Sequence, residues 1–234
     1  MSAPESAMKS TAASLGQRLD RVFADLMVLA EKTTGIIASS GTSRNMLEAL
    51  KPEVARIVED QAGLVESAGV SVIPGLLDDA DTWHQWWSLI DGQLVFVPHN
   101  LNPASINYYD YTEMTWFERP LASGHPELIG PYLDFGGANT KIVTASRPVV
   151  IESRTVAIAG ADLTMDFIER IFLRNLGRRD EPIALITETG KVVASNSARF
   201  APGTRFERPE EHPGSVPVPV TELAASPWRL IVAG

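Results

Sequence analysis

The chain has 234 residues, of which 44% are hydrophobic and none is cysteine; 20 lysines and arginines against 29 aspartates and glutamates give a net charge of −9. This composition is that of a folded protein of one or two domains, and it excludes disulfide frameworks, thiolate zinc sites and cysteine nucleophiles. The acidic balance argues against direct nucleic-acid binding, because negative charge repels phosphate backbones.

The sequence lacks any run of about 18 apolar residues, so we expect no membrane span in this chain. Its serine- and alanine-rich start has no apolar signal-peptide segment before Arg18. We therefore expect a free-standing cytoplasmic protein. A fragment of a membrane receptor would show the same features, and its location would then be extracytoplasmic.

Two helices are predicted at the N-terminus. Apolar residues at three- and four-residue steps predict a long amphipathic helix over about 14–39. The same period restarts over about 43–60, with Thr42 or Ser43 as the N-cap and Pro52 as an irregularity. We interpret the apolar stripes as core or dimer contacts rather than as a ligand site.

Short β-branched and aromatic runs follow. Residues 86–90 and 93–97 flank Asp91-Gly92, which is a strong hairpin signal. Further strands are predicted over 140–150 and 154–161. These runs indicate an antiparallel sheet.

The segment between and after these strands carries two further signals. Gly136-Gly137-Ala138-Asn139 is interpreted as a turn rather than as a phosphate-binding loop. Helical spacing returns over about 164–176, with Asp162 or Thr164 as the cap.

The C-terminal part is predicted to be β-rich. A second hairpin joins 182–186 to 191–194 through Thr189-Gly190, and a last strand is expected at 228–232 after a proline-rich excursion. The elements together predict an α+β protein: a long helix packed on an antiparallel sheet, with a smaller β-rich lobe. The corresponding regions are 1–62, 63–176 and 177–234.

Motifs for catalysis are missing. The four histidines are scattered without zinc-binding spacing, and the sequence has no nucleophile elbow or nucleotide-binding loop. Asp162 and Asp166 could pair as acid and base, but a helix cap and a solvated carboxylate explain them more simply. We expect no enzyme activity, no cofactor and no metal.

The middle third is crowded with aromatic residues: Trp83, Trp86, Trp87, Phe96, Tyr108, Tyr109, Tyr111, Trp116, Phe117, Tyr132 and Phe135. Carboxylates at Asp110, Glu113, Asp134 and Asp162 are interleaved with them or follow them. Aromatic faces attract ammonium groups and a carboxylate supplies the countercharge, so the region suits a small cationic ligand. The alternative is that the aromatic residues form only a core.

Four motifs in this region occur in a specific order. They are W-[YF] at Trp116-Phe117, P-Y-x-D at 131–134, S-x-P-V at 146–149 and G-x-D-[IL] at 160–163. Their order and spacing resemble the Cache, or PDC, family of sensor domains, most closely over 83–170 and, as in double Cache domains, over a second lobe at 182–233. The resemblance implies a PAS-like antiparallel sheet behind a long helix, binding of a small molecule, and no catalysis.

The resemblance also implies the ligand-binding positions. The family's first tyrosine, tryptophan, later tyrosine and aspartate correspond to Tyr109, Trp116, Tyr132 and Asp162. Two positions depart from the family pattern, since the arginine is Met114 and the second aromatic of the pair is Phe117. We add Trp87, Asp134 and Thr144 as further candidate ligand-binding residues.

Met114 bears on the identity of the ligand. Methionine cannot clamp a ligand carboxylate through a bidentate fork, as arginine does. With Asp162 available for a protonated amine, the expected ligand is an amine, a quaternary ammonium compound or a similar small polar metabolite. If Arg119 or Arg147 supplied a substitute clamp, small carboxylates would remain candidate ligands.

Signalling by such a domain requires an output. We expect a homodimer through the N-terminal helix, an output partner of unknown identity, and closure of the loop at 98–113 over the ligand. One competing hypothesis is an interaction or scaffold protein with a solid aromatic core, and a weaker one is a hydrolase using Asp162 and Asp134. A ligand-sized cavity against Trp116 and Tyr109 would favour the sensor over the scaffold.

Overall fold

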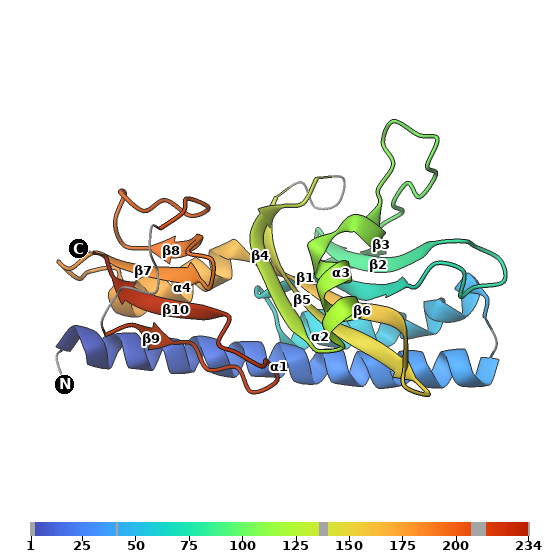
Figure 1. Cartoon of the computed structure of the whole chain (residues 1–234), viewed down its shortest axis with the longest axis horizontal. Helices are drawn as coiled ribbons and strands as arrows, with labels where there is room; N and C mark the ends of the chain where they lie inside the picture. Colours follow the sequence, from blue (N-terminus) through green and yellow to red (C-terminus); the bar gives the residue numbers. More distant parts are fainter. Residues whose placement is uncertain (1–2, 41, 136–139, 207–213, 234) are drawn as a thin grey trace. The chain divides into compact units, whose positions relative to one another are not determined.

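The computed structural model describes residues 3–40, 42–135, 140–206 and 214–233, so the predicted turn at Gly136-Gly137-Ala138-Asn139 lies outside the described residues. Contacts divide the chain into two compact units, drawn with all elements in Figure 1. The larger unit is Val22–Leu163, and the smaller unit combines Met1–Arg21 with Thr164–Gly234. The sequence-based division at residues 62 and 176 stays a prediction.

The larger unit contains a six-stranded sheet in the order β3-β2-β1-β6-β5-β4. Its strands are β1 (Val65–Val72), β2 (Trp83–Ile90), β3 (Gln93–Phe96), β4 (Glu127–Leu133), β5 (Lys141–Ile151) and β6 (Arg154–Thr164). The strand pairs with a described register are antiparallel. The predicted α+β class with an antiparallel sheet is confirmed.

The hairpin between β2 and β3 is confirmed. Asp91 and Gly92 both have positive φ, 50° and 77°, as a two-residue turn of type I′ requires. The other predicted strand pair is also present, but β6 continues past residue 161 to Thr164. Asp162 is therefore a strand residue and not a helix cap; the N-cap position before α4 (Met165–Leu176) is Thr164.

One face of the sheet is covered by helices. α1 (Ala3–Ser40) begins earlier than the predicted first helix, and the predicted second helix is split into η1 (Arg44–Leu50) and α2 (Lys51–Asp60). The α-helix begins beside Pro52, a residue that is tolerated only in a first turn. Ser43 occupies the N-cap of η1, but the Asp79 carboxylate accepts the hydrogen bond from Arg44 N (2.9 Å).

Alternation along β2 places its two adjacent tryptophans, Trp86 and Trp87, on opposite faces of the sheet. Gln85, whose Nε2 donates to Glu48 of η1 (3.1 Å), and Trp87 share the face toward the helices. His84 and Trp86 point to the other face, where Trp86 lies 6.0 Å from Trp116 between ring centroids. Trp87 therefore belongs to the core between the sheet and the helices.

The second face of the sheet is covered by η2 (Tyr111–Glu113) and α3 (Thr115–Ser123). A buried cluster of Tyr109, Tyr111, Trp116, Phe117 and Ile158 fills this layer, with Met114 and Tyr132 packed against it. Tyr111 ties the layer to the sheet, because its hydroxyl donates to Val72 O (2.7 Å) and accepts from Trp83 N (3.1 Å).

The smaller unit contains a four-stranded sheet in the order β8-β7-β10-β9, together with α4. Its strands are β7 (Ile183–Thr187), β8 (Val192–Ser195), β9 (Val216–Pro217) and β10 (Trp228–Val232). The predicted second hairpin, the last strand and the β-rich character of this lobe are confirmed. Among the described residues, no helix combines the length and apolarity needed to cross a bilayer.

Replacing Trp87 by alanine should lower the free energy of unfolding by about 3–5 kcal/mol, because the indole is fully buried and its removal leaves a cavity. Trp87 Nε1 has no hydrogen-bond partner in the described part of the chain, so Trp87→Phe should cost less than half as much. Urea unfolding followed by circular dichroism measures both. A cost below about 1 kcal/mol for Trp87→Ala would contradict this placement.

Candidate ligand-binding site

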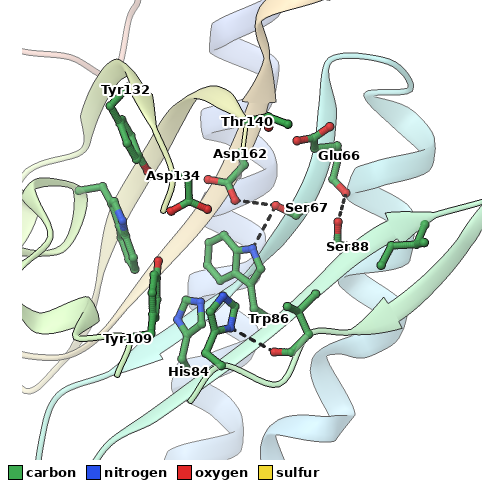
Figure 2. Close-up of a pocket in the computed structure, with 14 residues that line it drawn as sticks. Glu66, Ser67, His84, Trp86, Ser88, Tyr109, Tyr132, Asp134, Thr140 and Asp162 are labelled. Carbon is green, nitrogen blue, oxygen red and sulfur yellow. Dashed lines mark hydrogen bonds between the residues drawn. The ribbon is translucent and has the colours of Figure 1, made fainter. Parts of the chain in front are cut away.

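A cavity of about 310 Å³ lies in the larger unit, on the sheet face that carries α3. Figure 2 shows the side chains around it. β1, β2 and β6 supply its base, and the segments before and after α3 supply aromatic and acidic walls. Its volume is at the lower end of the range for small-molecule sites, about 300–1,000 Å³.

Trp86 forms part of the base of this cavity. A Cβ on Gly160 would lie 2.9 Å from Trp86 Cη2, and one on Gly69 would lie 2.8 Å from Trp86 Cε3. Gly69 and Gly160 are cross-strand partners on β1 and β6. The two glycines thus leave the space in which the indole lies flat against the sheet.

Asp162 occupies the centre of the cavity base, and only 7% of it is exposed. Its Oδ2 accepts a hydrogen bond from Ser67 Oγ (2.6 Å), and its Oδ1 accepts one from Thr144 Oγ1 (2.8 Å). Both hydroxyls belong to neighbouring strands, β1 and β5. The sheet itself therefore fixes the orientation of the carboxyl group.

Each of these hydroxyls is positioned in turn by an aromatic side chain. Trp86 Nε1 donates to Ser67 Oγ (3.0 Å), and Tyr132 Oη lies 2.6 Å from Thr144 Oγ1. Because Thr144 donates its proton to Asp162, the Tyr132 hydroxyl is the donor in the second pair. Two donor chains, one from each aromatic residue, thus end on the two oxygens of Asp162.

The environment of Asp162 disfavours its charge. Burial raises the pKa of Asp162 to about 7, and the nearby charges of Asp134 and Glu66 act in the same direction. The hydrogen bonds from Ser67 and Thr144 oppose this rise. A cation in the cavity would remove the cost of ionising Asp162, since an opposite charge favours the ionised form.

Two histidines line the aromatic end of the cavity. His84 stacks on Trp86 with 4.7 Å between ring centroids and meets His99 edge-on at 4.5 Å. Burial lowers the pKa of His84 well below its usual value, helped by the charge of His99, and burial also lowers the pKa of His99. Both rings are therefore neutral at pH 7 and carry no positive charge to the carboxylates.

The tyrosines of the site keep their protons. Burial raises the pKa of Tyr109, with a further contribution from Asp134, and burial together with Asp162 raises the pKa of Tyr132. Among the described lining residues none is lysine or arginine, whereas Glu66, Asp134 and Asp162 are acidic. The cavity therefore combines neutral aromatic rings with carboxylates.

Five of the nine predicted ligand-binding residues line the cavity together: Tyr109, Trp116, Tyr132, Asp134 and Asp162. Thr144 lies behind Asp162 and orients it by donating a hydrogen bond to its carboxyl group. Phe117 and Met114 pack within or against the aromatic cluster, and Trp87 points to the opposite face of the sheet. None of these four lines the cavity.

Five further lining residues bear on the chemistry of the site but were not among the predicted ones: Glu66, Ser67, His84, Trp86 and His99. Trp86 and His84 could have been found by counting alternate positions along β2, and His99 by extending the count past the end of β3. Ser67 and Glu66 carry no comparable signal, because serine, glycine and alanine obscure the pattern of β1.

Two alternatives from the sequence can be compared with this geometry. Neither Arg119 nor Arg147 lines the cavity, and Arg119 Nη2 forms an ion pair with Glu127 Oε2 (2.9 Å). Asp134 and Asp162 both line it, but within the described ranges no group of three or more His, Cys, Asp or Glu could hold a metal ion. Because neither arginine lines the cavity, a substitute clamp for a ligand carboxylate has no support at this site.

Comparison with known proteins agrees with the motifs. Residues 94–170 match the family model described as "Methyl-accepting chemotaxis protein-like, first PDC sensor domain". No curated protein matches the sequence. Among solved structures, Methyl-accepting Chemotaxis protein X aligns with a TM-score of 0.73 at 14% identity, covering 97% of this chain and 94% of that chain.

Two other structures extend the comparison. The ligand-binding domain of the amino acid chemoreceptor PctC of Pseudomonas aeruginosa, in complex with GABA, aligns with a TM-score of 0.64 at 17% identity, covering 98% of both chains. The extracellular domain of the histidine kinase mmHK1S-Z3 aligns with a TM-score of 0.64 at 14% identity, covering 86% of this chain and 72% of that chain.

Fold and motifs together define the class as an α+β protein with a PDC-like fold. The segment matched by the family model, residues 94–170, contains all four motifs that carry the resemblance to the Cache, or PDC, family. The predicted cytoplasmic location finds no support in these neighbours, since one of them is an extracellular domain.

The raised pKa of Asp162 predicts a pH dependence of stability. Between about pH 4 and pH 7 the unfolded chain loses this proton first, so the native state binds more protons and the free energy of unfolding falls as pH rises. Above about pH 7 this contribution is constant. Its size is about 1.4 kcal/mol for each unit by which the two pKa values differ.

Urea unfolding of wild type and Asp162→Asn across this pH range isolates the effect, because the other carboxylates are common to both proteins. The difference between the two stabilities should shift in favour of Asp162→Asn as the pH rises to about 7. Parallel pH profiles would contradict the raised pKa.

Proposed function

We propose that the chain is the ligand-binding part of a signal sensor and that its ligand is a small cation, an amine or a quaternary ammonium compound. The observation that carries this proposal is the buried Asp162 carboxyl, oriented by two hydroxyls at the base of an aromatic cavity. Aromatic faces attract cations, and a desolvated carboxylate provides the countercharge.

Met114 supports a ligand without a carboxylate. It stands where the resemblance places an arginine, and it packs against the aromatic cluster outside the cavity. GABA, the ligand named for the PctC structure, carries an amine and a carboxylate. The present cavity offers an acidic group for the first and no described lysine or arginine for the second.

The cavity also bears on the competing hypotheses. A scaffold protein would fill the space against Trp116 and Tyr109 with side chains, whereas both residues line an opening of ligand size. A hydrolase using Asp134 and Asp162 needs a positioned water or metal as well as the two carboxylates. The family is one of sensors, which favours a binding role without catalysis.

Signal output requires that ligand binding shift a structural equilibrium. The loop between His99 and Tyr109 begins and ends at residues that line the cavity. Its two ends are joined by a hydrogen bond from Tyr109 N to Asn100 O (2.8 Å). Closure of this loop on a ligand would therefore move two walls of the site. We propose an extracytoplasmic location, as for the histidine kinase neighbour, and an output partner whose identity is open.

Asp162→Asn should abolish or weaken amine binding by about 2–5 kcal/mol, because it removes the charge while keeping the shape of the side chain. Calorimetric titration with alkylamines, tetraalkylammonium ions, amino acids and short carboxylates measures this. Asp166→Asn, at an exposed position of α4, is the matched control and should bind as wild type does. Carboxylates that bind equally well to wild type and Asp162→Asn would refute the cation proposal.

We also propose a homodimer through α1. In the larger unit Met27 is 40% exposed on this helix, although it is a large apolar residue. Met27→Arg should therefore weaken self-association without loss of fold, and light scattering after size-exclusion chromatography measures it. A monomeric wild-type protein, with and without ligand, would rule out this arrangement.

A further inference from the structure

The two hydroxyls that donate to Asp162 differ in whether their hydrogen-bond chains can reverse direction. Ser67 Oγ accepts from Trp86 Nε1 (3.0 Å), and an indole N–H can only donate. Thr144 Oγ1 lies 2.6 Å from Tyr132 Oη, and each of these hydroxyls can donate or accept. The chain that joins Tyr132 to Asp162 can therefore run in either direction, whereas the chain from Trp86 runs only toward the carboxyl group.

We propose that Thr144 is a positioning residue whose hydroxyl couples the protonation state of Asp162 to the direction of the Tyr132 hydroxyl. When Asp162 is ionised, Thr144 donates to it and accepts from Tyr132, so Tyr132 presents only oxygen lone pairs to the cavity. When Asp162 is protonated, it donates to Thr144, Thr144 donates to Tyr132, and the Tyr132 proton turns toward the cavity. This relay of three residues goes beyond the proposed function, because it sets the hydrogen-bond polarity of one wall for any ligand.

The two oxygens of Asp162 are not equivalent positions for the added proton. A proton on Oδ1 faces Thr144 Oγ1 (2.8 Å), whose own proton then has an acceptor in Tyr132. A proton on Oδ2 faces Ser67 Oγ (2.6 Å), which already accepts from Trp86 and would lose the acceptor of its own proton. Because an unmade hydrogen bond on a buried hydroxyl is costly, the proton is favoured on Oδ1. Reversal then needs only rotation of two hydroxyls about their C–O bonds.

Tyr132 is placed to pass this change on to a ligand. It lines the cavity, and among the described residues the hydrogen-bond partner of its hydroxyl is Thr144. In the view of Figure 2 the hydroxyl points toward the side of the cavity where Asp134 and Asp162 lie. A ligand group that donates hydrogen bonds fits the ionised state of the relay, and a group that accepts them fits the protonated state.

Other titratable groups share the cavity with Asp162. They come from several elements: Glu66 of β1, His84 of β2, His99 after β3, Tyr109 before η2, Tyr132 of β4 and Asp134 after β4. A β-bulge between Val65 and Ser67 turns Glu66 toward the cavity, and the charges of Asp134 and Glu66 both oppose ionisation of Asp162. Burial raises the pKa of Asp162 to about 7, so both states of the relay are populated near neutral pH.

Carbon NMR of the protein without ligand tests the relay. The Tyr132 Cζ resonance, assigned with Tyr132→Phe, reports on the hydrogen bonding of its hydroxyl, and the Asp162 carboxyl carbon, assigned with Asp162→Asn, reports on ionisation. In wild type both signals should change with one midpoint, at about pH 7. Thr144→Val keeps the branched shape without the hydroxyl. In this variant Asp162 should still titrate, with its midpoint shifted upward, and the pH response of Tyr132 should be lost.

Ser67→Ala is the matched control, because Ser67 donates to the other oxygen of Asp162. It should also shift the Asp162 midpoint upward, but Tyr132 should continue to follow that midpoint. Thr144→Ser keeps a hydroxyl and should restore the coupling that Thr144→Val removes. Circular dichroism checks that each variant is folded, and Thr144→Ala replaces Thr144→Val if the valine variant does not fold.

Two results would overturn the relay. A Tyr132 response that persists in Thr144→Val would mean that the charge of Asp162 acts on the ring directly through space. A wild-type Tyr132 signal that stays constant from about pH 4 to about pH 9 would contradict the coupling itself. Because these measurements contain no ligand, either result leaves the proposed cation binding to be decided by its own titrations.

Discussion

The carboxyl group of Asp162, buried in the middle of a β-sheet, is the constraint on which the site depends. Burying an ionisable group is costly unless its oxygens are hydrogen-bonded. Ser67 and Thr144 meet this requirement from the strands on either side, and Trp86 and Tyr132 position those two hydroxyls. Three strands and two aromatic walls are thus organised around one carboxyl group.

The small residues of the sheet are part of the same arrangement. Gly69 and Gly160 have no side chains at the place where Trp86 lies, and any Cβ there would collide with the indole. With the indole against the sheet, its N–H reaches Ser67 and the space above its ring stays open as part of the cavity. Residues that read as weak strand formers in the sequence are therefore required by the packing of the site.

Regular features of the sequence predicted much of this structure. Turn residues and the apolar period predicted the two hairpins, the last strand and the helix before the smaller sheet. The motifs selected five residues that line one cavity in the structure: Tyr109, Trp116, Tyr132, Asp134 and Asp162. The sheet face of adjacent residues was harder to predict, since alternation places Trp86 at the cavity and Trp87 in the core. The bulge that turns Glu66 inward depends on pairing between β1 and β6, which no local pattern in the chain encodes.

Burial of Asp162 also connects the affinity of the site to the proposed signalling function. In the absence of a cation, a fraction of the molecules carries this carboxyl in its protonated form near neutral pH, because burial and neighbouring acidic groups oppose its charge. A bound ammonium favours the ionised form, so part of its binding free energy is spent on releasing that proton. A ligand shifts a conformational equilibrium only by binding one state better than the other. Under the proposed function, a closed conformation that brings His99 and Tyr109 over the cation would remove water from this ion pair and strengthen it, so the buried carboxyl would favour binding to that state.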